Sequence, residues 1–350
     1  MSKVQVIEVG EDDSDQRLDR WLRRIFPHIN QIRIEKMCRK GEIRVDGGRV
    51  KPATRLQAGQ QVRIPPLPDA GEVAAARKSA PTRVSDADAR MIRDCVIYKD
   101  DHIIALNKPP GLPTQGGSKQ TKHVDGLAEA LKFDLDEKPR LVHRLDKDTS
   151  GVLILARTRK MASALTTAFR HHATRKIYWA VVAGVPTPYL GEIKYGLVKA
   201  PGHGKRGEGE KMLCVHPRDV AQTEGAKRAI TQYATLYRVA SRAAWVALEP
   251  ITGRTHQLRA HMAEIGHPII GDGKYGGSGQ ENLGDGWGAH MGGVISNKLH
   301  LHARSFTFEH PATFEAMTIT ADLPDHMAAT WETFGWTPDL AADDPFEALQ

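Results

Sequence analysis

His143-Arg144-Leu145-Asp146-Lys147-Asp148-Thr149-Ser150-Gly151 runs directly into the apolar segment Val152-Leu153-Ile154-Leu155-Ala156. Because the polar part ends in glycine and the apolar part is short, the pattern predicts a turn that leads into a buried strand. Asp146 lies between basic residues, so its carboxylate can be exposed, rigidly held and kept ionised. A catalytic carboxylate has these properties. A solvated turn with a local salt bridge is the alternative, since structural ion pairs are common.

Length and composition describe an ordinary globular protein with a moderate excess of positive charge. The 350 residues are enough for about two domains, and 40% of them are hydrophobic while 26% are charged. The formal net charge is +7 and the sequence pI is near 9.2. This balance favours a polyanionic partner. Aromatic residues make up only 6%, so any base stacking must rely on a few well-placed rings.

Cysteine usage and hydropathy predict a soluble protein of the cytoplasm. Cys38, Cys95 and Cys214 are far apart and form no CxxC pair, which favours a reducing compartment. The same spacing argues against a zinc site or a disulfide framework. The N-terminus has no apolar signal core, and no run reaches membrane-spanning length. We therefore expect no membrane partner and no metal.

The positive charge is concentrated near the N-terminus. Residues 15–63 contain 13 Lys/Arg and 5 Asp/Glu, a net charge of +8, so the rest of the chain is close to neutral. Leu18, Trp21, Leu22 and Ile25 follow helical spacing and predict one apolar helix face. The segment is therefore expected to fold as a small unit with a basic surface.

A second helix and a hairpin are predicted in the same segment. Asn30 suits an N-cap and Gly41 follows the last helical residue, while Ile32 and Met37 mark the buried side. Asp46-Gly47-Gly48 then predicts a hairpin turn between two short strands. Cations are costly to bury, so those of this segment must lie in solvent or on a ligand. The candidate RNA-binding residues are Arg33, Lys36, Arg39, Lys40, Arg44 and Lys51.

The chain is expected to divide into two domains, a linker and a tail. We predict a small domain over residues 1–66, a linker over 67–90, a large domain over 91–335 and a frayed acidic tail over 336–350. The expected fold class is α+β, with an extended, mainly antiparallel mixed sheet and a small N-terminal α/β domain. Strands are predicted at 96–98, 103–106, 152–156, 177–182, 230–240, 245–249 and 299–308, and helices at 160–170 and 255–265.

Two further motifs in the large domain carry residues suited to chemistry. The segment 252–261 places a Thr-Gly turn before a helix that carries Arg254 and Arg259. His256 and His261 are five residues apart, which is not the spacing of a helical zinc pair, so we expect both to be structural. In Arg175-Lys176-Ile177-Tyr178-Trp179 the two rings alternate along a strand, so one can lie in the core while the other faces a pocket.

Taken together, these segments resemble two known families. Residues 92 to about 325 resemble the RluA-type pseudouridine synthases, and the N-terminal segment resembles the αL-type RNA-binding domain of a small-subunit ribosomal protein and of tyrosyl-tRNA synthetase. The combination is similar to the branch that acts on large-subunit ribosomal RNA, and residues 115–118 favour its C-type members. The likeness is carried by Asn107–Gly111, His143–Gly151, Arg175–Tyr178, Thr252–His261, Gly266–Asp272 and Leu299–Ala303, and at the N-terminus by Arg17-Leu18-Asp19, Ile32-Arg33, Gly41–Gly47 and Val50-Lys51.

The resemblance to the synthases implies a role for several residues. Asp146 aligns with the catalytic aspartate, and Arg259 aligns with the arginine that pairs with it. Tyr178 aligns with the tyrosine that stacks on the target base. Arg144 aligns with the arginine that fills the space left when the uridine flips out.

The activity implied by the resemblance is isomerisation of uridine to pseudouridine in RNA. Lys108 and Arg254 complete the expected substrate-binding set. The expected partner is large-subunit ribosomal RNA or its precursor, and not DNA. The reaction needs no redox change, group donor or energy source, so no cofactor is expected. Two alternatives stay open: a non-catalytic RNA-binding or ribosome-assembly factor on the same fold, and a nuclease or phosphotransferase that uses Asp146 and Asp148.

Overall fold

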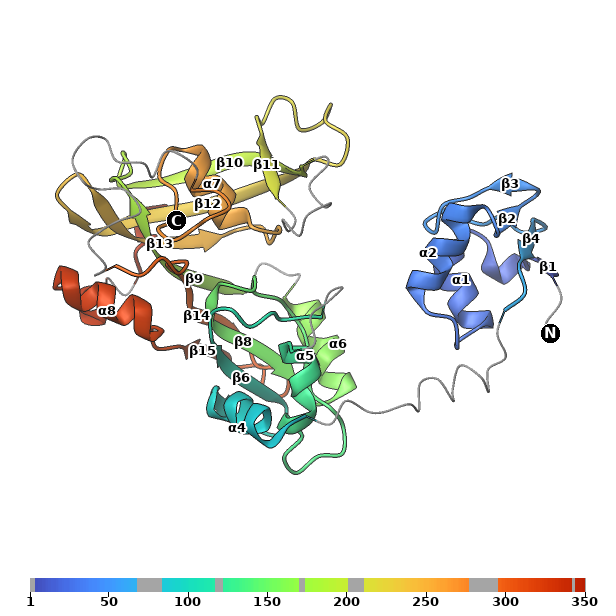
Figure 1. Ribbon diagram of the computed structural model, residues 1–350, viewed down its shortest axis with the longest axis horizontal. Coiled ribbons are helices and arrows are strands. Elements are labelled where there is room, and N and C mark those ends of the chain that lie inside the picture. The colour runs from blue at the N-terminus through green and yellow to red at the C-terminus, as the bar shows by residue number, and fades with distance from the viewer. Residues whose placement is uncertain are drawn as a thin grey trace. The chain divides into compact units, whose positions relative to one another are not determined.

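The computed structural model forms two compact units, Met1–Arg83 and Val84–Gln350 (Figure 1). It describes residues 4–67, 84–116, 122–169, 174–200, 211–276, 295–341 and 344–349. Most of the predicted linker, half of the segment 115–118 and most of the glycine-rich sequence 271–297 lie outside these residues.

The N-terminal unit combines two helices with a small antiparallel sheet of order β1-β4-β2-β3. The Asn30 side chain accepts a hydrogen bond from the Arg33 N–H, and Gly41 adopts the left-handed conformation that ends α2, so both predicted caps are confirmed. Asp46 and Gly47 both have positive φ, as a tight hairpin turn requires. The elements are β1 (Gln5–Glu8), a 3-10 turn (Glu11–Asp13), α1 (Leu18–Ile25), α2 (Gln31–Lys40), β2 (Arg44–Val45), β3 (Gly48–Arg49) and β4 (Gln61–Ile64).

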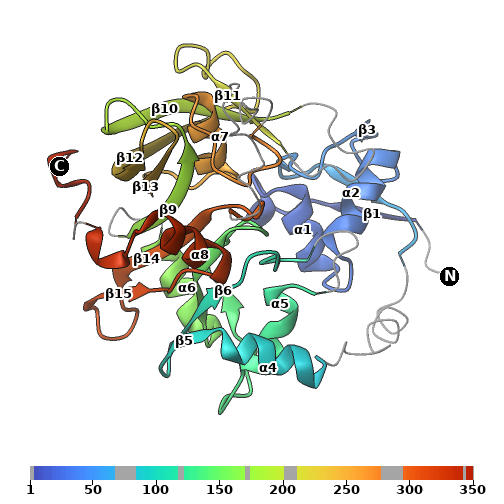
Figure 2. The same cartoon turned by 60° about the vertical axis from the view of Figure 1, so that its left-hand side comes forward.

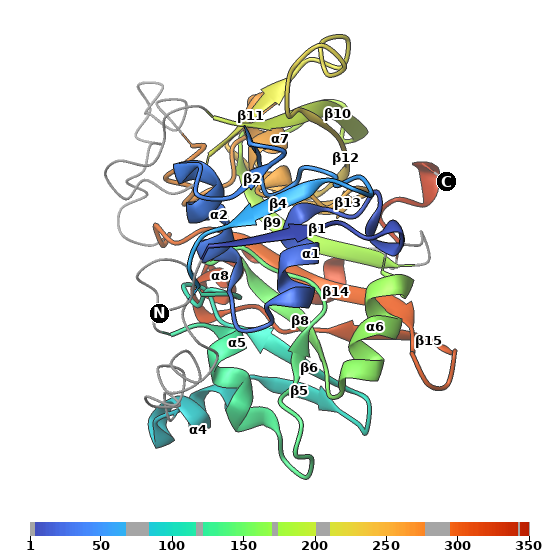
Figure 3. The same cartoon turned by 90° about the vertical axis from the view of Figure 1, so that its right-hand side faces the viewer.

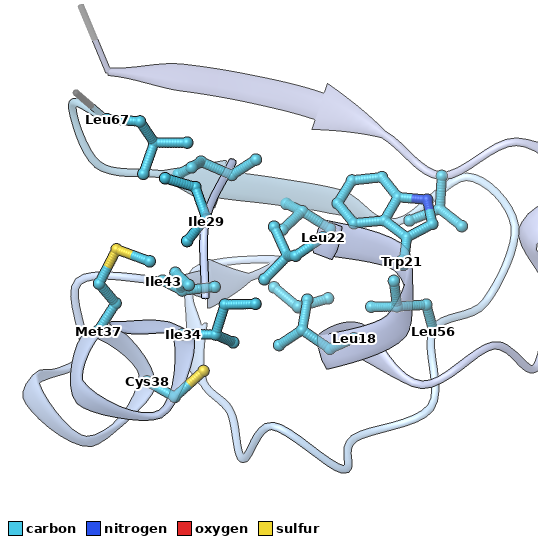
Figure 4. Packing of buried hydrophobic residues seen from close by; sticks show 14 residues of the cluster. Leu18, Trp21, Leu22, Ile29, Ile34, Met37, Cys38, Ile43, Leu56 and Leu67 are labelled. Atoms are coloured by element: carbon cyan, nitrogen blue, oxygen red, sulfur yellow. The ribbon is translucent and has the colours of Figure 1, made fainter. Parts of the chain in front are cut away.

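A single hydrophobic cluster fills this unit (Figure 4). The predicted α1 face is mostly buried there: Leu18, Trp21 and Leu22 are buried and Ile25 is partly buried. The prediction for α2 is wrong at Ile32, whose side chain is 75% exposed, while Ile34 is fully buried. Helical spacing explains the difference, because Ile34 lies three and four residues before Met37 and Cys38 and so shares their face.

The second unit is built on one mixed sheet in which β14 and β8 form a parallel pair and every other described pair is antiparallel. The main path of the sheet runs β11-β10-β12-β13-β9-β14-β8-β6-β5. The expected fold class is confirmed. The strands are β5 (Val96–Lys99), β6 (Ile103–Lys108), β7 (Arg140–Leu141), β8 (Ser150–Ala156), β9 (Arg175–Ala183), β10 (Leu190–Lys199), β11 (Met212–Val215), β12 (Lys227–Val239), β13 (Ala243–Pro250), β14 (Leu301–Glu309) and β15 (Ala316–Thr320).

Helices cover both faces of this sheet. Alternate residues of β8 pack into two cores: Leu153 and Leu155 join α4 and α5, whereas Val152 and Ile154 join α6. Figure 3 labels β8 and the three helices. At the other end, α7 packs against β11 and β12 (Figure 2). The helices are α4 (Asp86–Asp94), α5 (Val124–Leu127), α6 (Arg159–Ala168), α7 (Gln257–Glu264) and α8 (Asp325–Phe334), with 3-10 turns at Ala128–Leu131, Pro338–Leu340 and Glu347–Leu349.

Two predicted boundaries of this unit need correction. Residues 86–90 belong to α4, so the segment between the domains ends earlier than expected. The C-terminal segment is not frayed in its described part, because Phe346 is fully buried in a cluster with Trp245 and Trp331. Asp344 also accepts two hydrogen bonds from Arg175, at 2.8 and 2.5 Å. The tail is thus packed onto β9.

Candidate active site

A cavity of about 740 Å³ opens where the loop before β8, the start of β9 and the turn into α7 meet. These elements are labelled in Figure 1. The three sequence motifs, which are far apart along the chain, all contribute to its lining. From the predicted set, the cavity brings together Arg144, Asp146, Tyr178, Arg254 and Arg259.

The loop that carries Asp146 is fixed on both sides of that residue. The Lys147 carbonyl accepts hydrogen bonds from the Gly111 N–H at 2.9 Å and the Lys108 ammonium at 3.0 Å. The Thr114 hydroxyl bonds both the carbonyl and the N–H of Leu145, at 2.6 and 3.2 Å. Because the neighbours of Asp146 are held this way, its carboxylate is presented with little backbone freedom.

Gly151 fixes where β8 begins. Its φ is +107°, and a Cβ at this position would lie 2.2 Å from the Ala303 carbonyl oxygen. Glycine is therefore required for the parallel contact of β8 with β14, in which Gly151 faces Ala303. This contact positions the end of the Asp146 loop against the centre of the sheet.

The turn before α7 is held by the Gln257 side chain. Its carbonyl oxygen accepts from the Thr252 hydroxyl and the Arg254 N–H, and its amide donates to the Ile230 carbonyl and the Thr231 hydroxyl. His256 adopts a left-handed conformation, with φ of 52°, directly before the helix. A histidine in this region is uncommon and marks a conformation imposed by its surroundings.

Arg259 is held mainly by Asp272, a residue without an assigned role in the sequence analysis. Its Nε and Nη2 each donate to Asp272 at 2.7 Å, and both side chains are almost fully buried. Burial disfavours the charged form of Arg259, but the hydrogen bonds to Asp272 outweigh this and raise its pKa. The Nη1 of Arg259 lies 3.9 Å from an Asp146 carboxylate oxygen. Arg259 thus faces the catalytic candidate while Asp272 fixes its direction.

His256 also faces Asp146. Its Nε2 lies 3.9 Å from the Asp146 carboxylate oxygen, and its Nδ1 shares a hydrogen bond of 2.9 Å with the Tyr275 hydroxyl. Burial lowers the pKa of His256 and Asp146 offsets this only in part, so the ring is neutral at pH 7. The hydrogen bond to Tyr275 agrees with the structural role expected for His256, whereas its approach to Asp146 was not expected from the sequence.

Tyr178 is the ring that faces the cavity, and Trp179 lies in the core. Tyr178 pairs with Leu248 of β13 and Ala303 of β14, so it stands in the middle of the sheet. Burial, followed by the charge of Asp146, raises the pKa of the Tyr178 phenol and keeps it protonated. Trp179 is only 5% exposed. The predicted division between the two rings is confirmed.

Arg144 and Arg254 are the exposed cations of the cavity lining. The Nε of Arg254 donates to the Arg228 carbonyl at 3.2 Å, which holds it beside β12. The remaining predicted residues, those of the N-terminal unit, are all exposed: Arg33, Lys36, Arg39, Lys40, Arg44 and Lys51. Arg44 donates to the carbonyls of Gly41 and Gly47 at 3.3 Å, which places it across the hairpin turn.

Lys108 is not placed to touch a substrate, which corrects its predicted role. It is fully buried, and its ammonium group donates to the carbonyls of Pro109, Leu112 and Lys147 at 2.9, 2.9 and 3.0 Å. Burial lowers its pKa to about 7, and the charges of Asp148 and Asp146 act in the opposite direction. Lys108 therefore positions the loop that carries Asp146.

Replacing Lys108 by methionine is expected to loosen that loop. Three buried carbonyls lose their donor, so the free energy of unfolding should fall by about 2–3 kcal/mol. Urea unfolding followed by circular dichroism measures this change. Lys147→Met is the matched control, because the Lys147 side chain is exposed, and it should change stability by less than about 0.5 kcal/mol. Equal stability of the two variants would contradict the assignment.

Within the described ranges, no group of three or more His, Cys, Asp or Glu side chains could hold a metal ion. No helix in the described part of the chain is long and apolar enough to cross a membrane.

Comparison with known proteins identifies the family. The model of the family described as RNA pseudouridylate synthase matches residues 102–264. Ribosomal large subunit pseudouridine synthase C of Vibrio vulnificus is 34% identical over 330 residues, which cover 93% of this chain and 95% of the relative. The chain belongs to the RNA pseudouridylate synthase family. Members of this family are isomerases that act on RNA, so this synthase is an enzyme of that class.

Other matches extend to both units of the synthase. Ribosomal large subunit pseudouridine synthase C of Escherichia coli K12 is 33% identical over 324 residues, 92% of this chain and 94% of the relative. The solved structure of human RNA pseudouridylate synthase domain containing 4 is 30% identical with a TM-score of 0.53, and covers 70% of this chain and 94% of that one. The S4 domain model matches residues 16–62, within the N-terminal unit.

Proposed function

We propose that this synthase converts uridine to pseudouridine in large-subunit ribosomal RNA, with Asp146 as its catalytic carboxylate. The observation that carries the proposal is the position of Asp146, which lies in the cavity within 3.9 Å of both Arg259 and His256. The large-subunit target is supported by relatives of that name that match over nearly their whole length. Ribosomal RNA as substrate also favours a cytoplasmic location.

The reaction balances without any outside reagent. The bond between uracil N1 and ribose C1′ breaks, the ring turns in the cavity, and C5 bonds to C1′ in its place. C5 loses a proton and N1 gains one. The ribose becomes electron-poor at C1′ when the first bond breaks, so an ionised carboxylate beside it lowers the barrier either by its charge or by bonding to C1′.

The other cavity residues take roles that follow from their positions. Arg259 is fixed by Asp272 and keeps a positive charge 3.9 Å from the Asp146 carboxylate. Tyr178 offers a rigid ring on which the detached uracil can stack. Arg144 is exposed at the rim, where it can occupy the space that the flipped uridine leaves. Stacking on Tyr178 within the cavity would keep the detached uracil from escaping.

An inactive RNA-binding or assembly factor on this fold is the less favoured function. One cavity contains the Asp146 carboxylate, its neighbours Arg259 and His256, and the Tyr178 ring. The activity is tested by tritium release from ribosomal RNA that is transcribed with uridine tritiated at carbon five. We expect release with a defined stoichiometry per RNA molecule. A protein that binds this RNA and releases no tritium would show that the proposed activity is wrong.

The N-terminal unit is proposed to bind RNA through its phosphates. It contains the S4 match and the exposed cations of α2 and the hairpin. Deleting residues 1–83 should weaken RNA binding and reduce the slope of log affinity against log salt, since several phosphate contacts are lost. Filter binding at four salt concentrations measures the slope. The remaining unit, residues 84–350, has its own core and should keep its unfolding midpoint. An unchanged slope of log affinity against log salt would refute the phosphate contacts.

A further inference from the structure

Lys176 is a cation of the active-site cavity without a role in the mechanism above. It lies two residues before Tyr178 on β9, so both side chains project from the same face of the strand, and both line the cavity. Its ammonium group lies 4.8 Å from the ring centre of Phe306 and 5.8 Å from that of Phe169. The two rings hold the charge in place, but they do not neutralise it.

Adjacent residues of β9 differ sharply in how their charge is compensated. Arg175 is paired with Glu249 at 3.0 Å and with Asp344 at 2.5 Å. Lys176 has no carboxylate within ion-pairing distance among the described residues. Lys176 is therefore a cation of the cavity lining that has no ion-pairing partner among the described residues.

Electrostatics make an anionic ligand favourable at this position. Burial lowers the pKa of Lys176, which means that the surroundings disfavour its charge in the empty cavity. Glu249 also lines the cavity, but Arg175 already engages it. An anion bound to Lys176 would relieve the cost of burial, and a full negative charge would do so best.

We propose that the Lys176 ammonium group binds a phosphodiester that flanks the flipped uridine. This inference rests on the proposed function and adds a substrate contact to it. Two residues of strand separate Lys176 from Tyr178 by about 6.6 Å. At that separation the cation can reach past the edge of a base stacked on Tyr178 to a phosphate of the same strand. The contact would hold the backbone while the base turns.

The test combines a variant of the protein with a neutralised phosphate in the RNA. The probe is a short synthetic stem-loop centred on a uridine that the wild-type synthase modifies, with single methylphosphonate linkages placed in turn around it. Binding is measured in an Asp146→Asn background, so that turnover does not change the probe. We compare Lys176→Met, Lys176→Arg and the control Lys160→Met, which removes the same charge from an exposed site on α6.

Lys176→Met should weaken binding about tenfold and reduce the salt slope by about one, as expected for one lost phosphate contact. Lys176→Arg should keep most of the affinity, and Lys160→Met should bind like the parent. One methylphosphonate linkage should weaken RNA binding by the Asp146→Asn parent. The same linkage should not weaken binding further when Lys176→Met is also present. If every methylphosphonate linkage lowered RNA affinity equally in the parent and in Lys176→Met, the proposed contact between Lys176 and a phosphate would be overturned. Failure of the wild-type synthase to modify any uridine would instead overturn the proposed function.

Discussion

Replacing Asp146 by asparagine is expected to abolish pseudouridine formation and leave the fold intact. Among the described residues, no hydrogen bond ties the Asp146 side chain to its surroundings, and the loop is held through the backbone of its neighbours. Asparagine has nearly the same shape, so the unfolding midpoint should not change. Activity should fall by about a thousandfold or more, because the amide can neither form a bond to C1′ nor stabilise positive charge there.

The matched control for this variant lies two residues away in the same motif. Asp148 is exposed and has no role in the proposed reaction, so Asp148→Asn removes an equal charge outside it. Tritium release under single-turnover conditions compares the two variants, and filter binding checks that both still bind RNA. Activity of Asp146→Asn within tenfold of Asp148→Asn would remove Asp146 from the catalytic role.

The second large effect is expected at the buried pair of Arg259 and Asp272. Arg259→Met leaves the Asp272 carboxylate buried without its partner, which should lower the free energy of unfolding by about 3–5 kcal/mol. Adding Asp272→Asn removes the stranded charge, while the asparagine oxygen can still accept from the N–H groups of Lys274 and Tyr275. The double variant should therefore regain most of the lost stability.

Activity separates the structural role of this pair from its role at Asp146. The double variant is stable but lacks the cation beside Asp146, so its tritium release should stay as low as that of the single variant. Urea unfolding and single-turnover release on the same preparations provide both measurements. Recovery of activity together with stability would mean that Arg259 acts only through folding.

The pH dependence of stability gives a further check on the pair. Burial raises the pKa of Asp272, but the hydrogen bonds from Arg259 outweigh it and leave the pKa lowered. A carboxyl group with a lowered pKa stabilises the fold at neutral pH, and this contribution is lost as the pH falls from the unfolded value through the folded value. The wild-type protein should show this loss in acid, and the double variant should show less of it.

Local signals in the sequence predicted several features of the backbone. Asn30 begins α2 and Gly41 ends it as expected, and β6 stops at Lys108 because two prolines follow it. The apolar run after Gly151 forms β8, which is buried along its whole length. These features are determined by residues that are adjacent along the chain, so they can be predicted from the sequence alone.

Features that depend on distant contacts could not be predicted in this way. Asp272 follows the predicted helix by several residues and has no predicted role, and only the folded chain places it beside Arg259. The acidic segment 336–350 holds two rings, Trp336 and Phe346, and the burial of Phe346 depends on its contact with the tryptophan cluster of α8 and β13. The strands β10 and β11 were not predicted either, because partly exposed residues weaken their alternation.

Mapping of pseudouridine across total RNA tests the central claim most directly. A strain that lacks the gene is complemented with wild-type protein, with Asp148→Asn or with Asp146→Asn, each expressed to the same level. The account predicts that specific large-subunit ribosomal uridines lose pseudouridine in the deletion strain, and that wild type and Asp148→Asn restore it while Asp146→Asn does not. Restoration by Asp146→Asn, or an unchanged ribosomal map in the deletion strain, would contradict it.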